Sequence, residues 1–139
     1  MRLVLDSSVL IAAFISRAGV CAELLEEILM QDTLVLSKAI LDEVGQKLAE
    51  KFSFPESVIV DLRQALERYA ELVEPDDVPP EFCRDPDDLI ILGTARAARA
   101  DLLITVDRAL LVLRRYASTD VVKPGEYWER KRDVQAPPR

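Results

Sequence analysis

Two short apolar runs in this sequence each end at an aspartate. Residues 3–5 are followed by Asp6, and residues 102–106 are followed by Asp107. Such runs predict buried strands, and the helical periodicity of the segments between them predicts a parallel α/β sheet with right-handed crossovers. The carboxyl ends of parallel strands share one rim, where such sheets bind ligands. The sequence therefore predicts that Asp6 and Asp107 lie on the same rim.

The other expected elements follow from hydrophobic periodicity and capping residues. Strands are expected at 3–5, 34–36, 102–105 and 121–122, and helices at 9–15, 22–30, 38–51, 55–72, 86–98, 109–113 and 124–128. Ser37 and Asp85 are the expected N-caps of the third and fifth helices. Prolines and acids in residues 74–80 predict a loop. Asp101 precedes the strand at 102–105, so it is expected on the opposite rim from Asp6.

The length of 139 residues fits one domain. We expect this domain to span residues 1–130 and to be followed by a flexible tail at 131–139. No apolar run approaches the roughly 18 residues of a membrane span, so no membrane association is expected. Asp6 interrupts the first apolar run too early for a secretory signal. Cys21 and Cys83 have no metal-binding spacing, and a cytoplasmic protein with reduced thiols is expected.

The chain contains no histidine, which excludes Ser-His-Asp and Cys-His catalysis and any histidine-ligated zinc or iron site. Chemistry must therefore rely on carboxylates, lysine, tyrosine, hydroxyls or an oxygen-bound metal. The net charge is −7 and the pI about 4.7. A nucleic-acid substrate would then need a local basic patch, or a metal that bridges to phosphate, because the surface as a whole repels it.

Three acids, Asp85, Asp87 and Asp88, gather at the start of the helix expected at 86–98. The helix dipole favours acids there, and a capping box accounts for one of them. Three acids in four residues exceed what capping needs, and a bound cation would offset their mutual repulsion. Asp88 directly precedes the apolar run, so it is the one expected to face the core.

The other acids also have structural explanations. Asp6 and Asp107 could each cap the helix that follows. Glu43 lies just outside the apolar stripe of its helix, and a solvated helix face explains it equally well. These alternatives stay open on the residues alone.

Oxygen ligands gathered on one rim would favour a hard divalent cation such as Mg²⁺ or Mn²⁺. The hydroxyls of Ser8 and Thr105 are expected near the same rim, where they could orient water at the metal. As isolated residues, serine and threonine more often form turns. Clustered carboxylates should raise the pKa of at least one of them in the metal-free protein.

Four segments together resemble the acidic motifs of the PIN-domain family of metal-dependent ribonucleases. They are residues 5–10, 37–44, 83–88 and 100–107. The resemblance extends over residues 1–128, and it is strongest to VapC-like ribonucleases, the toxin components of toxin–antitoxin systems. It implies a three-layer α/β/α fold with a central parallel sheet of four to five short strands.

Transferred position by position, the resemblance implies a catalytic metal site. Its ligands would be Asp6, Glu43, Asp88 and Asp107, with Ser8, Asp87 and Thr105 as secondary candidates. Two positions depart from the family pattern. Ser8 stands where relatives often have asparagine, and Ala109 where many carry another aspartate. The missing carboxylate favours one well-held metal over two.

The implied reaction is hydrolysis of RNA phosphodiester bonds by an endoribonuclease that uses Mg²⁺ or Mn²⁺, with 5′-phosphate and 3′-hydroxyl products. The resemblance also implies a cognate antitoxin and a homodimer. We expect an inhibitor to present arginine or lysine to the carboxylates.

Two other functions account for parts of the same pattern. A catalytically inactive PIN module that binds a protein or RNA would explain Ser8 and Ala109. Phosphatases resembling haloacid dehalogenases place a second aspartate two residues after the first, and this chain has Ser8 there.

Overall fold

A computed structural model describes residues 1–135 of the chain and confirms the α/β class. The strands are β1 (Arg2–Leu5), β2 (Thr33–Leu36), β3 (Glu71–Leu72), β4 (Leu102–Ile104), β5 (Arg115–Tyr116) and β6 (Thr119–Val122). The helices are α1 (Ser7–Ile15), α2 (Val20–Gln31), α3 (Lys38–Phe52), α4 (Glu56–Tyr69), α5 (Pro86–Ala98), α6 (Arg108–Leu111) and α7 (Pro124–Gln135). Pro80–Phe82 form a 3-10 turn.

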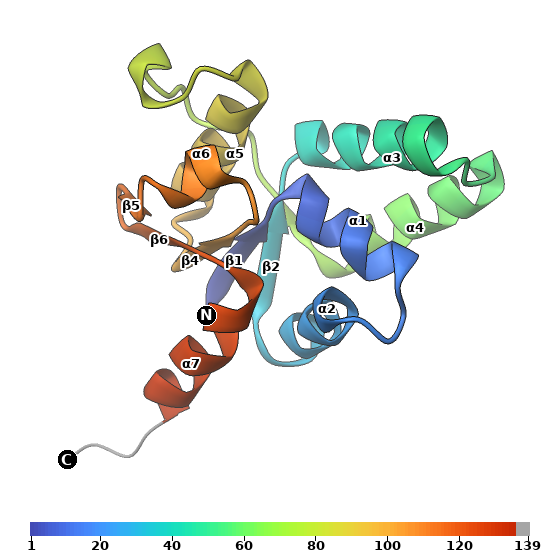
Figure 1. Cartoon of the computed structure of the whole chain (residues 1–139), viewed down its shortest axis with the longest axis horizontal. Helices are drawn as coiled ribbons and strands as arrows, with labels where there is room; N and C mark the ends of the chain where they lie inside the picture. The colour runs from blue at the N-terminus through green and yellow to red at the C-terminus, as the bar shows by residue number, and fades with distance from the viewer. Residues whose placement is uncertain (136–139) are drawn as a thin grey trace.

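The strands form one sheet with the order β3-β2-β1-β4-β6-β5. All neighbouring pairs are parallel except β5 with β6. In Figure 1, helices α1 to α4 lie to the right of the central strands, and α5 and α6 lie above the part of the sheet formed by β4, β6 and β5. The expected three-layer arrangement with a parallel sheet is confirmed: β3, β2, β1, β4 and β6 form the parallel part, and β5 adds a sixth, antiparallel strand at one edge. The two unpredicted strands, β3 and β5, are two residues long and too short for a periodicity to reveal.

The central strands are apolar because both of their faces are covered. Leu3, Val4 and Leu5 of β1 are 0% exposed, and Leu103 and Ile104 of β4 are equally buried. Strands buried on both faces read as continuous apolar runs rather than as alternating patterns. The same burial fixes where each strand ends, since the first polar residue after it reaches the rim.

The end of α4 corrects the sequence analysis, which extended this helix to residue 72. The helix ends at Tyr69, and the chain turns extended at Ala70. Glu71 and Leu72 then pair with Val35 and Leu36 of β2. Pairing with β2 therefore sets the end of this helix, and the hydrophobic periodicity of the helix itself does not indicate that end.

Helix α7 is longer than the helix expected at 124–128, and the domain boundary expected at residue 130 stays a prediction. The helix continues to Gln135, and Lys131 donates a hydrogen bond of 3.0 Å to Asp32. This contact ties the first part of the expected tail to the domain. Residues 136–139, the rest of that tail, lie outside the described residues.

Gly93 allows the loop before α5 to lie directly on that helix. The backbone N–H of Asp76 donates a hydrogen bond of 3.0 Å to the Gly93 carbonyl. A Cβ atom at Gly93 would collide with the Asp76 carbonyl oxygen. One residue later, the Thr94 hydroxyl donates to the Ser37 hydroxyl at 2.9 Å, which links α5 to the start of α3. These contacts hold two of the helices that carry acidic side chains.

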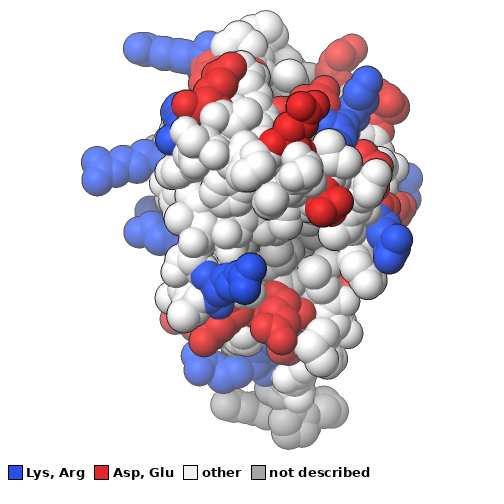
Figure 2. Space-filling view, turned by 90° about the vertical axis from the view of Figure 1, so that its right-hand side faces the viewer, with Lys and Arg blue, Asp and Glu red and all other residues white. Residues whose placement is uncertain are grey.

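Within residues 1–135 no single helix is both long and apolar enough to cross a membrane. Helices α1 and α2 reach that length and composition only as a pair bent by 108°. On the face shown in Figure 2, the described acidic and basic side chains are interspersed around an uncharged area, without a continuous basic patch.

Candidate active site

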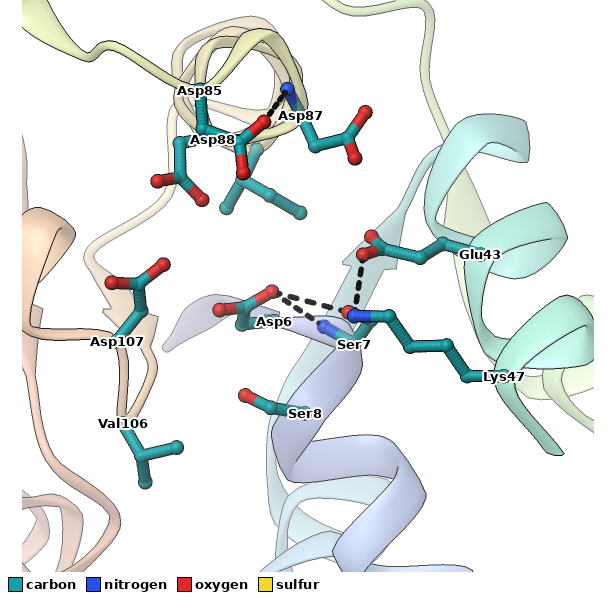
Figure 3. A pocket seen from close by; sticks show the side chains of 11 residues that line it. Asp6, Ser7, Ser8, Glu43, Lys47, Asp85, Asp87, Asp88, Val106 and Asp107 are labelled. Atoms are coloured by element: carbon teal, nitrogen blue, oxygen red, sulfur yellow. Dashed lines mark hydrogen bonds and ion pairs between the residues drawn. The ribbon is translucent and has the colours of Figure 1, made fainter. Parts of the chain in front are cut away.

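One pocket collects the predicted carboxylates at the carboxyl-terminal rim of the sheet. Its volume is about 240 Å³. The lining residues are Asp6, Ser7, Ser8, Glu43, Lys47, Asp85, Asp87, Asp88, Ile91, Val106 and Asp107. In Figure 3 the acids at the start of α5 and Asp107 face Asp6 across the pocket, and Glu43 and Lys47 reach in from α3. The prediction that the four acids gather is therefore confirmed.

Asp6 directly follows β1, and its backbone N–H continues the sheet by donating to the Ile104 carbonyl at 3.0 Å. Its side chain is buried, with a residue exposure of 6%. One carboxylate oxygen accepts the Ser7 backbone N–H at 2.7 Å and so caps α1. Asp6 therefore both caps α1 and lies on the predicted carboxyl-terminal rim of the sheet.

Thr105 holds Asp6 and Asp107 in relation to each other. Its fully buried hydroxyl donates to Asp6 Oδ2 at 2.7 Å and accepts the Asp107 backbone N–H at 3.0 Å. Asp107 in turn caps α6 by accepting the Ala109 N–H at 2.9 Å. The sequence ranked Thr105 as secondary, and the structure gives it a positioning role between two strands' ends.

Asp88 occupies the third position of α5 and is 8% exposed, whereas Asp87 beside it is exposed. Asp85 is the N-cap and accepts the Asp87 N–H at 2.9 Å. The helix therefore turns Asp88 inward as predicted. It also brings Asp85 to the pocket, although the sequence analysis assigned that residue to capping alone.

Burial and the neighbouring negative charges raise two pKa values in the pocket. Burial, followed by the charges of Asp107, Asp85 and Asp6, raises the pKa of Asp88 to about 7. Burial also raises the pKa of Asp6, against the hydrogen bonds from Thr105 and Ser7 that lower it. The expectation that clustering raises at least one carboxylate pKa is confirmed. Burial is the larger cause of both shifts, and the neighbouring carboxylates add to it.

Lys47 is the one cation among the residues that line the pocket. Its ammonium nitrogen lies 2.8 Å from Glu43 Oε1, one helical turn away on α3. The pKa of Lys47 is raised mainly by this contact. The i,i+4 spacing of an acid and a lysine was a usable signal. Asp101, by contrast, is exposed on the opposite rim as expected, where it accepts the Arg2 backbone N–H at 2.8 Å.

The pocket fits a hard cation in its chemistry, although its side chains are not closed around one. Its polar lining is dominated by six carboxylates. The buried Ser8 hydroxyl oxygen, which lines the same pocket, has no hydrogen-bond partner. Oxygen donors and uncompensated negative charge suit Mg²⁺ or Mn²⁺. Among residues 1–135, however, no group of three or more acidic or cysteine side chains is positioned closely enough to coordinate one metal ion. Their role as metal ligands stays a prediction.

Comparisons with known proteins give a family and a fold. The family model described as PIN domain matches residues 2–109. The search of curated proteins finds no match. Among solved structures, the chain is similar to VapBC2 from Rickettsia felis, crystallised with a DNA fragment from its promoter. The TM-score is 0.62 at 16% identity, and the match covers 88% of this chain and 98% of the other.

Proposed function

Because this chain belongs to the PIN domain family of nucleases, we propose that it is a metal-dependent endoribonuclease, the toxin of a toxin–antitoxin pair. The observation that carries the proposal is the pocket in which Asp6, Glu43, Asp88 and Asp107 converge from four separate elements. A histidine-free chain has few other ways to activate water. We further propose that it acts in the cytoplasm.

Asp6, Glu43, Asp88 and Asp107 would hold the ion. When bound there, Mg²⁺ or Mn²⁺ neutralises phosphate charge and lowers the pKa of a water molecule. The chain's own contribution is the placement of these groups. Thr105 orients Asp6 and the backbone of Asp107, and the start of α5 delivers Asp88. The hydroxyl of Ser8 is free to bind water or substrate in the pocket.

The test is cleavage of a circular single-stranded RNA by the purified protein with Mn²⁺ or Mg²⁺. Only an endonuclease linearises a circle, and the resulting ends report the chemistry. We expect 5′-phosphate and 3′-hydroxyl ends from the wild type and no product from Asp6→Asn. Asp101→Asn, an acid-to-amide change on the opposite rim, is the matched control and should cleave like the wild type. An inactive wild type, or an active Asp6→Asn, would overturn the proposal.

An inactive binding module is the second candidate function. The observation in its favour is that the acids of residues 1–135 are not arranged around a metal as they stand. Ser8 and Ala109, which depart from the family pattern, point the same way. RNA binding without cleavage, unchanged in Asp6→Asn, would support this function.

We also propose an antitoxin partner and a homodimer. The similar Rickettsia felis structure is a VapBC2 complex, and the acidic pocket here is complementary to a basic side chain. A co-complex structure tests the partner. An inhibitor with no arginine or lysine near Asp6 or Asp107 would contradict the expected mode of inhibition. Light scattering of the purified chain tests the dimer, and a monomeric mass would exclude it.

A further inference from the structure

Lys47 is the one cation among the residues that line the pocket, where it faces six carboxylates. It lies one turn after Glu43 on α3, and the two side chains form an ion pair of 2.8 Å. Figure 3 shows both side chains extending from α3 toward the end of β1, where Asp6 lies. Lys51, one further turn along the same helix, is exposed and is not among the lining residues.

Helix stability is a weak explanation for this lysine. Ion pairs at i,i+4 on partly exposed helix faces contribute little, and here the side chains of Lys47 and Glu43 keep 35% and 23% of their exposure. The α4 pair Arg63–Glu67 has the same spacing and does not line this pocket. The feature particular to Lys47 is its place beside the candidate metal ligands.

Glu43 cannot neutralise Lys47 and a divalent cation equally well. A dication on the Glu43 carboxylate would withdraw its negative charge and repel the ammonium group at short range. Lys47 would then lose its ion pair with Glu43, although its side chain would still line the pocket and be available to another anion. The anion that enters next, if the proposed function holds, is an RNA phosphate.

We propose that Lys47 is a phosphate-binding residue of this site. It pairs with Glu43 in the free protein; when a divalent cation binds Glu43, Lys47 binds an RNA phosphate instead. This inference rests on the proposed ribonuclease function. A lysine is a compact point charge and a common phosphate ligand. It supplies positive charge inside a pocket whose carboxylates repel RNA, in a chain of net charge −7.

If Lys47 exchanges partners in this way, its removal should strengthen Mn²⁺ binding and weaken RNA binding. A lysine with only a structural role would not produce these opposite effects. In Lys47→Met, Glu43 loses its competitor, so Mn²⁺ measured alone by isothermal titration calorimetry should bind about threefold to tenfold more tightly. With a mixed-sequence single-stranded RNA and saturating Mn²⁺, KM should rise by about tenfold, while kcat changes less. The dependence of log KM on log salt should weaken by about 0.7, as expected when one phosphate contact to a single strand is lost.

Two further variants complete the experiment. Lys51→Met removes an equal charge from the same helix outside the pocket and should match the wild type in all three measurements. Lys47→Arg keeps the charge and should restore most of the RNA affinity.

The outcomes separate the two proposals. If the wild type cleaves RNA but Lys47→Met behaves like Lys51→Met, the role of Lys47 is wrong and the nuclease function stands. If Lys47→Met weakens Mn²⁺ binding, the lysine is structural and the exchange is excluded. If the wild type neither binds Mn²⁺ nor cleaves RNA, both proposals fail together.

Discussion

A buried carboxylate at one rim of the sheet and the acidic pocket at the opposite rim differ in their partners. At the amino-terminal rim, the Asp32 side chain is 1% exposed and carries three donors. Lys131 and the Met1 ammonium each lie 3.0 Å from Oδ1, and the Tyr127 hydroxyl donates to Oδ2 at 2.5 Å. At the other rim, six carboxylates share one lysine.

The pKa values follow this difference. Burial alone would raise the pKa of Asp32, but the hydrogen bonds from Tyr127, Lys131 and the amino terminus together lower it. In the pocket, burial and neighbouring charge raise the pKa of Asp88 to about 7. A buried acid supplied with donors stabilises the fold, whereas a buried acid surrounded by other acids marks a site prepared for a ligand. The following predictions test that distinction.

The largest expected effect is on activity. Asp88→Asn should reduce RNA cleavage by about 1000-fold, roughly 4 kcal/mol of transition-state stabilisation, because it removes a candidate metal ligand. At pH 8 the same variant should unfold at a higher urea concentration than the metal-free wild type, since it relieves repulsion in the pocket. A variant that loses both activity and stability would show that Asp88 is structural.

Asp32→Asn should reverse that pattern. It weakens the acceptor of Tyr127 and Lys131, and the free energy of unfolding should fall by about 2–3 kcal/mol. Cleavage by the folded protein should be unchanged. Asp120→Asn is the control, because Asp120 also pairs with two cations, Arg115 and Arg130, but its side chain is 26% exposed. Urea denaturation should show a smaller decrease in the free energy of unfolding for Asp120→Asn than for Asp32→Asn.

The two rims should respond to pH in opposite directions. The folded-state pKa of Asp88 lies above the value of 3.8 expected for the unfolded chain, so the folded protein binds the extra proton. Stability of the metal-free protein should therefore fall as pH rises from about 4 through 7.

The folded-state pKa of Asp32 is lowered, so its contribution is present above the unfolded value of 3.8 and is lost as pH falls through the folded value. Urea denaturation at a series of pH values measures both limbs. Asp88→Asn should flatten only the neutral limb, and Asp32→Asn only the acid limb. Equal flattening of both limbs by either variant would contradict the separation of the two groups.

The smallest effect concerns metal binding to the pocket alone. Mn²⁺ at ten times its dissociation constant should stabilise the wild type by about 1.4 kcal/mol. The same increment should appear in Asp32→Asn, measured from that variant's lower baseline, and should disappear in Asp88→Asn. Thermal denaturation with and without Mn²⁺ provides the comparison, and a metal effect that depends on Asp32 would argue against a site in the pocket.

Local chemistry in the sequence predicted much of this arrangement. The apolar runs before Asp6 and Asp107 located the rim, because strands buried on both faces must be apolar and must end at the first polar residue. The acids at the start of α5 were separable because a helix turns successive residues in different directions, and Asp88 precedes the apolar run. Glu43 came from family resemblance, since its own helix pattern is equally compatible with a solvated face.

Features that depend on distant partners were beyond the sequence alone. The place of Lys47 beside Asp6, 41 positions earlier in the printed sequence, is one that no local pattern reports. Asp85 was read only as a cap, although its side chain also borders the pocket. The two-residue strand β3 and the extension of α7 likewise depend on contacts with β2 and Asp32.

The sequence by itself determined the fold class and the rim to which Asp6 and Asp107 belong, because burial and strand direction impose both through short-range patterns. Only the tertiary structure decided how the carboxylates are compensated. Charge interactions act through space between elements far apart in the chain. The arrangement in three dimensions therefore gives Asp32 two cationic partners and a tyrosine hydroxyl, whereas Lys47 is the one cation among the residues that line the acidic pocket.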